Sequence, residues 1–488
     1  MAERAEVLIV GSGAGGAVTA HALADAGYSV TVLEEGGRFG VADYGAGGSE
    51  AMQLLYRRRG MTPIVGPVPI GYVEGACVGG STEINTGFWH RTPRETLLRW
   101  KARFDLPDAS EPELAVHFRW AEEALGVGPF EQAWPKSTQL FARGIEEMGW
   151  SYHEVPRAAP GCQQTNRCAQ GCPTGAKQGM TARILPQAER WGAKIIPNVR
   201  VTRLIKGRRR IQGVMATVRA DDGTEHLVRL DADHVFLCAG ATETPALLLR
   251  SGIKYHVGNT LRVHPYLKVV ARYRERVDAF QSVVPLLQVK EFWPDLALGG
   301  AFSSLGQLAM TLSDNWPQNQ RLMDDPSRLA MYYVGVRGTG RGWVRPSVFG
   351  EDAALTRYEL SEEDRKNLSV GLARLSSVLI ASGAKSLHPS VWGIEPLRKP
   401  IDAVRWLDER LPKSALSLVT VHAFSSCPMG ERRDLCAADG FGRVYGYDNL
   451  YLNDASMLPD SPGVNPQGSI MAFARRNALH FADQHPRR

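Results

Sequence analysis

The sequence has few cysteines, little net charge and no long uninterrupted apolar run, and each shortage excludes a class of protein. Seven cysteines in 488 residues are an odd number in a long chain, so a disulfide framework is not expected. A net charge of +6 is small for this length, and the arginine clusters at 57–59 and 208–210 are short, so we expect solvated loops there and no nucleic-acid partner. The longest uncharged run, residues 296–313, is broken by glycines and polar residues, so we expect no membrane span.

What remains is the composition of an ordinary globular protein, with 44% hydrophobic and 22% charged residues. The length predicts two or three domains, or one large composite domain. The N-terminal segment carries Glu3 and Glu6 and runs directly into an apolar stretch, without the basic start and small-residue cleavage site of a signal peptide. We therefore expect a cytoplasmic protein.

The first chemical signal is a glycine motif near the N-terminus. Residues 7–10 are a continuous apolar run that predicts a buried parallel strand, and an alanine-rich helix and a second strand at 30–33 follow the glycines. Strand, GxGxxG turn, helix, strand and terminal acid form the fingerprint of a dinucleotide site, because glycines permit a tight turn and a close approach of pyrophosphate to a helix N-terminus. The position near the N-terminus favours FAD over NAD. The residues expected to serve the cofactor here are Gly11, Gly13, Ala14, Gly16 and Glu34.

Five further blocks follow in the chain. A second glycine loop spans residues 75–85, and an apolar strand at 235–240 leads into a helix. Near the C-terminus, residues 422–430 and 449–456 precede a block at 462–466 that opens a final helix.

Together these blocks resemble the glucose-methanol-choline (GMC) family of flavin-dependent oxidoreductases, over nearly the whole chain and in the family's order. The resemblance implies FAD, bound non-covalently, because Ile84 stands where members with covalent FAD often have a histidine. Ala76 departs from the basic residue or Asn that is usual in the family. The resemblance further implies FAD contacts at Gly79, Gly80, Ser81, Asn85, Ala239, Asp454, Ala455 and Pro466.

The catalytic pair implied by the resemblance is His422 and Asn465. Alcohol oxidation needs a base near the working pH, a donor that holds the alkoxide, and positive potential near the flavin. Imidazole suits the first role, and an amide that cannot titrate suits the second. Asn465 and Pro466 begin a helix whose N-terminal dipole adds positive potential. We expect His264 and His388 to be loop or packing residues.

Three cysteines, Cys162, Cys168 and Cys172, lie within eleven residues and precede Pro173. Zinc sites and cubane clusters usually need four ligands, whereas three thiolates suit a [3Fe–4S] cluster. The stretch is similar to the cluster loop of some bacterial flavin-dependent glucose dehydrogenases, and a related loop occurs in GMC proteins resembling long-chain alcohol oxidases. An iron–sulfur cluster, a single disulfide and a packed loop of thiols stay open as alternatives.

The expected fold is α/β: a Rossmann-like FAD-binding domain of the glutathione-reductase type, interleaved with a substrate domain of antiparallel sheet backed by helices. Strands are predicted near 267–273 and 331–336, and a helix from Ser361 to Gly383. The predicted FAD-binding domain comprises residues 1–99, 181–262 and 419–488, with an insertion at 100–180 that carries the cysteine loop and a substrate domain at 263–418.

The predicted function is FAD-dependent oxidation of an alcohol to an aldehyde or ketone. The apolar, glycine-punctuated stretch 292–316 favours a hydrophobic or aromatic alcohol, although ordinary core explains it equally well. A sugar or glycoside dehydrogenase that passes electrons to an acceptor protein is one alternative. A flavin-scaffold lyase or decarboxylase is another, and a non-catalytic interaction protein is the weakest. Whether oxygen or an acceptor protein reoxidises the flavin stays open.

Overall fold

The glycine-rich N-terminal segment folds as its sequence predicts. In the computed structural model, which describes residues 4–45, 48–60, 62–220, 222–347 and 354–486, β1 (Ala5–Val10) leads through the glycine turn into α1 (Ala14–Asp25). β2 (Val30–Leu33) then returns parallel to β1, with Val7 opposite Val30. Residues 1–3, on which part of the expectation about a signal peptide rests, lie outside the described ranges.

A parallel sheet holds these strands together with strands from distant parts of the chain. Its order is β6 (Lys194–Ile196), β2, β1, β9 (Glu225–Leu237) and β20 (Leu450–Leu452), and every pairing among them is parallel. The first half of β9 extends beyond this sheet and pairs antiparallel with β8 (Ile211–Arg219), which pairs in turn with β7 (Val199–Lys206). The C-terminal segment is thus built directly into the N-terminal sheet.

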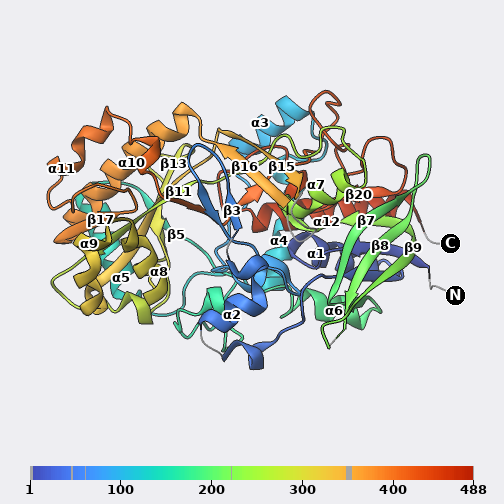
Figure 1. Ribbon diagram of the computed structural model, residues 1–488, viewed down its shortest axis with the longest axis horizontal. Coiled ribbons are helices and arrows are strands. Elements are labelled where there is room, and N and C mark those ends of the chain that lie inside the picture. Colours follow the sequence, from blue (N-terminus) through green and yellow to red (C-terminus); the bar gives the residue numbers. More distant parts are fainter. Residues whose placement is uncertain (1–3, 46–47, 61, 221, 348–353, 487–488) are drawn as a thin grey trace.

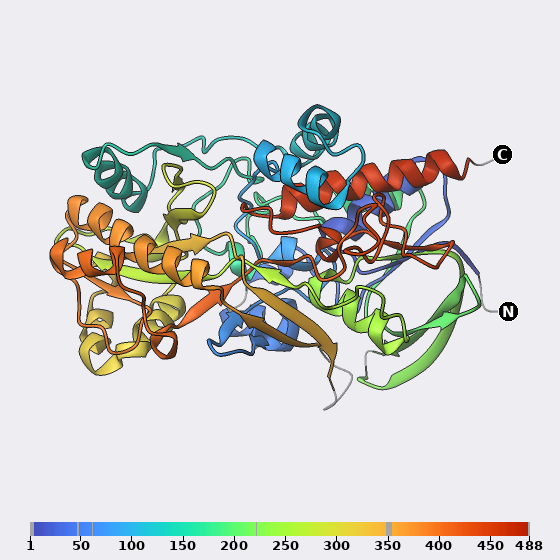
Figure 2. The same cartoon turned by 90° about the horizontal axis from the view of Figure 1, so that it is seen from above.

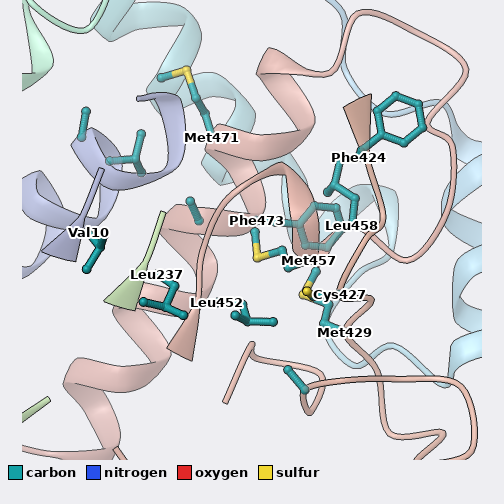
Figure 3. Packing of buried hydrophobic residues seen from close by; sticks show 14 of the residues in the cluster. Val10, Leu237, Phe424, Cys427, Met429, Leu452, Met457, Leu458, Met471 and Phe473 are labelled. Carbon is teal, nitrogen blue, oxygen red and sulfur yellow. The ribbon is translucent and has the colours of Figure 1, made fainter. Parts of the chain in front are cut away.

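Helices cover this sheet and close its core. α12 (Gln467–Gln484) lies against α1 and α4 (Glu111–Leu125), and α6 (Ile184–Arg190) also contacts α1. Figure 3 shows Val10, Leu237 and Leu452 of three adjacent strands near Phe473 of α12, and all four are at most 6% exposed. The remaining helices of this half are α3 (Arg94–Phe104) and α7 (Gly240–Arg250).

A second, mainly antiparallel sheet forms the other half of the molecule. Its order is β3 (Thr62–Ile64), β4 (Ile70–Tyr72), β18 (Leu418–Thr420), β11 (Tyr266–Arg272), β14 (Leu329–Val336), β13 (Leu296–Gly300), β12 (Leu287–Val289) and β5 (Tyr152–Glu154), with β17 (Ser386–Pro389) beside β11. The strands predicted near 267–273 and 331–336 are confirmed as β11 and β14.

Helix α10 (Glu362–Ala381) packs on this sheet together with α5 (Lys136–Glu147). Ser361 and Asp364 form a capping box at the start of this helix, with the Asp364 amide donating to Ser361 Oγ at 2.9 Å. One face of α10 is buried, with Leu368, Leu372, Leu375 and Leu379, and the predicted helix is confirmed. The smaller elements are α2 (Gly48–Leu55), α8 (Leu305–Leu312), α9 (Trp316–Asn319), α11 (Ile401–Val404) and the strand pairs β10 (Arg262–Val263) with β19 (Ala423–Phe424) and β15 (Arg341–Pro346) with β16 (Ala354–Glu359).

The two halves lie side by side along the long axis, with both termini at the end formed by the parallel sheet (Figures 1 and 2). The predicted α/β fold class is confirmed. The domain boundaries stay a prediction, since the second sheet also takes strands β3, β4 and β5 from residues 62–72 and 152–154. No helix in the described part of the chain is long and apolar enough to cross a bilayer.

Candidate active site

A cavity of about 350 Å³ is lined by residues of both the parallel sheet and the second sheet. Its walls come from segments that are far apart in the chain, and three helices begin at it: α1 at Gly13, α7 at Ala239 and α12 at Pro466. Each helix N-terminus carries partial positive charge, so the cavity favours an anionic ligand. Of the residues predicted to serve the cofactor, the cavity is lined by Gly11, Gly13, Ala14, Glu34, Gly80, Ser81, Asn85, Ala239, Asp454, Ala455 and Pro466.

The glycines of the first turn have separate roles. Gly11 has a φ of 96°, and a Cβ on it would come within 2.4 Å of the Cys238 carbonyl oxygen. A Cβ on Gly16 would come within 1.9 Å of the Gly11 carbonyl oxygen, and Gly16 is buried in the fold away from the cavity wall. Gly13 differs, because the nearest atom to its added Cβ would be Gly80 Cα at 3.9 Å. Gly11 and Gly16 therefore serve packing, while Gly13 leaves the backbone open toward the cavity.

Glu34 lies where the second strand ends and is buried. Its Oε2 accepts from the amide and the hydroxyl of Ser12, at 2.9 Å and 2.7 Å, and its Oε1 accepts from the Gly36 amide. Burial raises the pKa of Glu34, and the Ser12 bonds oppose that rise. The carboxylate is thus held in place beside the glycine turn.

The second glycine loop faces the first across the cavity. The Gly79 amide donates to Ser12 Oγ at 3.0 Å, which ties the two loops together, although Gly79 does not reach the cavity wall. Asn85 donates from Nδ2 to Gln467 Oε1 at 2.6 Å, at the start of α12. Gln467 also lines the cavity, and its place beside an expected cofactor residue depends on packing between segments 382 residues apart.

Asp454 holds the start of α7. Its Oδ2 accepts from the Gly240 amide at 2.8 Å and from the Thr244 hydroxyl at 2.5 Å, and its Oδ1 accepts from the Ser456 amide. Burial raises the pKa of this carboxyl, and these three hydrogen bonds oppose the rise. In the structure Asp454 therefore positions the backbone that lines the cavity.

His422 and Asn465, which are 43 positions apart in the chain, come together at the wall of the cavity. His422 Nε2 lies 3.4 Å from Asn465 Nδ2, and both residues line the cavity. The His422 side chain is buried, and burial lowers its pKa to about 3, so the imidazole is neutral at neutral pH. A neutral imidazole beside an amide donor can accept a proton while the amide holds an oxygen atom.

His264 lies in the short loop between β10 and β11 and is buried, as expected, but it also contacts the expected base. Its Nδ1 lies 3.1 Å from His422 Nδ1, on the side of His422 away from Asn465. The Tyr266 hydroxyl lies 3.0 Å from the same His422 atom. The residues next to His264 in the sequence give no indication of this contact, because His422 lies 158 positions away. His388, by contrast, is a buried packing residue between Asn319 and Ser386, as expected.

The first arginine cluster also differs from its prediction. Arg57 is not a solvated residue but is 7% exposed, and its guanidinium bonds Glu35 at 2.5 Å and Glu74 at 2.7 Å. All three residues line the cavity. The sequence shows only three consecutive arginines, and the two acids lie 22 and 17 positions away, so no local pattern indicates the buried network.

The stretch 292–316, predicted as a pocket wall, contributes Phe302 and Gln307 to the cavity, while Leu298 and Leu308 are ordinary core. Val421, which precedes the expected base, is 55% exposed and also lines the cavity. The cavity wall beside His422 is thus partly apolar.

The three clustered cysteines are free thiols, and no group of three or more His, Cys, Asp or Glu side chains among the described residues is placed to hold a metal ion. Arg157 donates to Cys162 Sγ and to Cys168 Sγ, at 3.5 Å each. The buried Lys177 ammonium donates to the carbonyl oxygens of Glu83, Asn85 and Cys168. These three thiols and their neighbours do not fit an iron–sulfur cluster. Through Lys177, the cysteine loop instead stabilises the second glycine loop.

Comparison with known proteins points to one family. Sequence models described as GMC oxidoreductase match residues 6–266 and 345–474. The chain is 37% identical over 474 residues to an uncharacterized GMC-type oxidoreductase of Sinorhizobium fredii, an alignment that covers 97% of this chain and 94% of the relative. It is 26% identical over 508 residues to a long-chain-alcohol oxidase of Arabidopsis thaliana, with 96% of this chain and 67% of the relative covered.

Among solved structures, pyridoxine 4-oxidase from Mesorbium loti matches with a TM-score of 0.73 at 17% identity, over 99% of this chain and 100% of that chain. A formate oxidase of Aspergillus oryzae matches with a TM-score of 0.72 at 16% identity. At these identities the likeness shows a shared fold.

Proposed function

The chain belongs to the GMC oxidoreductase family, whose members act on CH–OH groups as oxidases or dehydrogenases, and from that premise we propose that it oxidises a hydrophobic alcohol with FAD as cofactor and His422 as base. The observation that carries the proposal is the pair of His422 Nε2 and Asn465 Nδ2, 3.4 Å apart at the cavity wall.

The residues of the cavity fit FAD. Gly13 leaves an open cradle that a Cβ would fill, at the positive end of α1, where a pyrophosphate finds free amides. The Glu34 carboxylate lies within the same wall and suits a ribose hydroxyl. Ile84 offers no nucleophile, so the cofactor is held without a covalent bond to it. When bound, FAD supplies the hydride acceptor that alcohol oxidation needs.

His422 takes the hydroxyl proton of the substrate at Nε2. Burial keeps the imidazole neutral, and a neutral ring has the free electron pair that this step requires. The Asn465 amide donates to the substrate oxygen and does not titrate, so it stabilises the developing negative charge without competing for the proton. The N-terminus of α12, which begins directly after Pro466, adds positive potential at the same end of the cavity.

Phe302 and Val421 favour an apolar substrate, because both residues line the same cavity as His422. A long-chain-alcohol oxidase among the relatives supports the same class. The partner that reoxidises the cofactor is oxygen or an acceptor protein, and the two are separated by admitting air after reduction.

The test is anaerobic reduction of the holoenzyme by a panel of aliphatic, aromatic and sugar alcohols, with the flavin spectrum recorded throughout. Apolar alcohols are expected to bleach the flavin, and His422→Ala is expected to slow bleaching by about 100-fold or more. His388→Gln, which alters a buried histidine outside the cavity, serves as the control. Full bleaching of His422→Ala would refute the base assignment, and bleaching by sugars alone would refute the substrate class.

A further inference from the structure

His264 approaches His422 because of backbone register. β10 pairs antiparallel with β19, with Arg262 opposite Phe424 and Val263 opposite Ala423. The next position along each strand sets His264 opposite His422, and the His264 amide donates to the His422 carbonyl at 3.4 Å. The side chains are both buried, at 3% and 8% exposure, and their Nδ1 atoms are 3.1 Å apart. One proton must therefore lie between the two Nδ1 atoms, on one ring or the other.

The second nitrogen of His264 decides which ring carries that proton. His264 Nε2 lies 2.9 Å from Ser461 Oγ, and the Ser461 hydroxyl donates to the carbonyl of Arg337. A carbonyl oxygen only accepts, so the single Ser461 proton is committed to it. Ser461 must then accept a proton from His264 Nε2. His264 is consequently the Nε2–H tautomer, with an electron pair at Nδ1.

The tautomer of His264 determines the tautomer of His422. Burial lowers the pKa of His264 well below its ordinary value, and the positive charge of Arg337 lowers it further, so His264 is neutral. With an electron pair on His264 Nδ1, the shared proton belongs to His422 Nδ1. The His422 electron pair is then at Nε2, the atom that faces Asn465 and the cavity.

We propose that His264 is a positioning residue that holds His422 in the Nδ1–H tautomer through the ordered chain His422, His264, Ser461 and the Arg337 carbonyl. This inference rests on the proposed function, in which His422 Nε2 takes the substrate proton. The opposite tautomer would put a proton on Nε2 and would turn the Ser461 hydroxyl away from the Arg337 carbonyl. The same acceptor stabilises the imidazolium that forms when the substrate proton arrives.

The chain orients the base but does not carry its proton away. It ends at a peptide carbonyl, which takes no proton, so the substrate proton stays on His422 during the oxidative half-reaction. Ser461 is fixed for this purpose on both sides, because its amide donates to Asp460 and its carbonyl accepts from Arg99. Tyr266 Oη, 3.0 Å from His422 Nδ1, is a second acceptor for the same proton.

Two substitutions of His264 distinguish the effect of losing the Nδ1 acceptor from the effect of changing the size of the side chain. His264→Asn keeps an amide oxygen where Nδ1 stood, whereas His264→Gln moves the amide outward and removes that acceptor. In the holoenzyme we expect His264→Gln to lower the rate constant of flavin reduction about 10- to 100-fold, with substrate affinity within about twofold. His264→Asn should recover most of the rate. The acid limb of the pH profile should move to lower pH in His264→Gln, because the imidazolium loses its acceptor.

A spectroscopic readout reports the tautomer itself. In holoenzyme labelled with ¹⁵N-histidine, the His422 signals, assigned by their loss in His422→Gln, should show a protonated Nδ1 and an unprotonated Nε2. Ser461→Ala frees the His264 tautomer and should give a mixture. Tyr333→Phe removes a hydroxyl that accepts from Gln288 Nε2, on a ring that packs against Tyr266, and should change neither the rate nor the signals.

A protonated Nε2 in the unaltered holoenzyme overturns the proposal, as do equal rates and pH profiles for His264→Gln and His264→Asn. If His264→Gln does not fold, an unmixed Nδ1–H signal in Ser461→Ala overturns the direction of the chain. Failure of the proposed function looks different, because His422→Ala would then keep full flavin reduction. If His422→Ala is inactive while His264→Gln matches the unaltered enzyme, only the role of His264 fails.

Discussion

Gly13→Ala should weaken FAD binding without unfolding the protein. The added methyl finds no protein atom closer than 3.9 Å, and the backbone at Gly13, with φ −66° and ψ −167°, suits alanine. Replacing glycine reduces the conformational freedom of the unfolded chain and so stabilises the folded protein by about 0.4–1 kcal/mol, which offsets the weaker helix cap. The free energy of unfolding of the apoprotein should therefore change by about 0.5 kcal/mol or less.

The same methyl projects into the cavity, where the pyrophosphate would lie against the first turn of α1. Hydrogen bonds to a charged group contribute about 1.5–3 kcal/mol, and displacement of the phosphate by one methyl removes about one of them. The expected loss of FAD affinity is about 10- to 150-fold. Gly15→Ala is the contrasting change, since its Cβ would lie 1.9 Å from the Asn453 carbonyl oxygen and should destabilise the apoprotein itself.

The assay is titration of each apoprotein with FAD by flavin fluorescence, together with urea unfolding of the same samples. Gly128→Ala, whose Cβ would have no atom within 4 Å and which does not line the cavity, controls for glycine replacement as such. If the FAD affinity of Gly13→Ala is within twofold of that of the unaltered protein, the claim that Gly13 leaves space for the pyrophosphate is refuted. Unfolding of the Gly13→Ala apoprotein would refute the claim that the space is open.

Three further outcomes are expected. Arg57→Met should lower the free energy of unfolding by about 3–5 kcal/mol, because it removes the cation that pairs with the partly buried carboxylate of Glu35 and the buried carboxylate of Glu74. Arg58 is exposed, so Arg58→Met should change the free energy of unfolding by about 0.5 kcal/mol or less, and equal urea midpoints for the two variants would contradict this. Burial lowers the pKa of His388 to about 4, below its unfolded value, so the unfolded chain binds more protons and stability should fall as pH drops from about 6.5 to 4. The slope of unfolding free energy against pH should flatten in His388→Gln, and an unchanged slope would contradict the assignment. Thiol titration with Ellman's reagent should find seven thiols in denaturant, and elemental analysis should find no iron; a shortfall of thiols would indicate a disulfide. In the native protein Cys162 should react first, because it alone of the cysteines is partly exposed.

The dinucleotide turn could be predicted from sequence because all of its parts are local. Gly11, Gly13 and Gly16 stand within six residues of one another, between a continuous apolar strand and an alanine-rich helix that directly follow each other in the chain. The resemblance also placed His422 and Asn465, and the structure brings this pair together at the cavity.

The contacts around this pair could not be predicted, because they depend on register between distant strands. His264 lies 158 positions before His422, and only the pairing of β10 with β19 sets them opposite each other. A histidine before a proline carries no sign of such a partner. Arg57 is similar, because three consecutive arginines have the composition of a solvated loop, and only the fold supplies two buried acids for one of them.

The position of β20 determines when the protein can become active during synthesis. This strand joins β9 beside the N-terminal sheet, and the segment around it delivers His422, Asp454 and Asn465 to a cavity whose glycine turn was made first. A nascent chain that has emerged only to about residue 410 therefore exposes the unpaired edge of β9, the kind of edge to which chaperones and other chains bind. Because the proposed base lies in this late segment, a chain that ends before it has the glycine turn without the proposed catalytic pair, and we expect alcohol oxidation only after the segment from His422 to Asn465 has joined the fold.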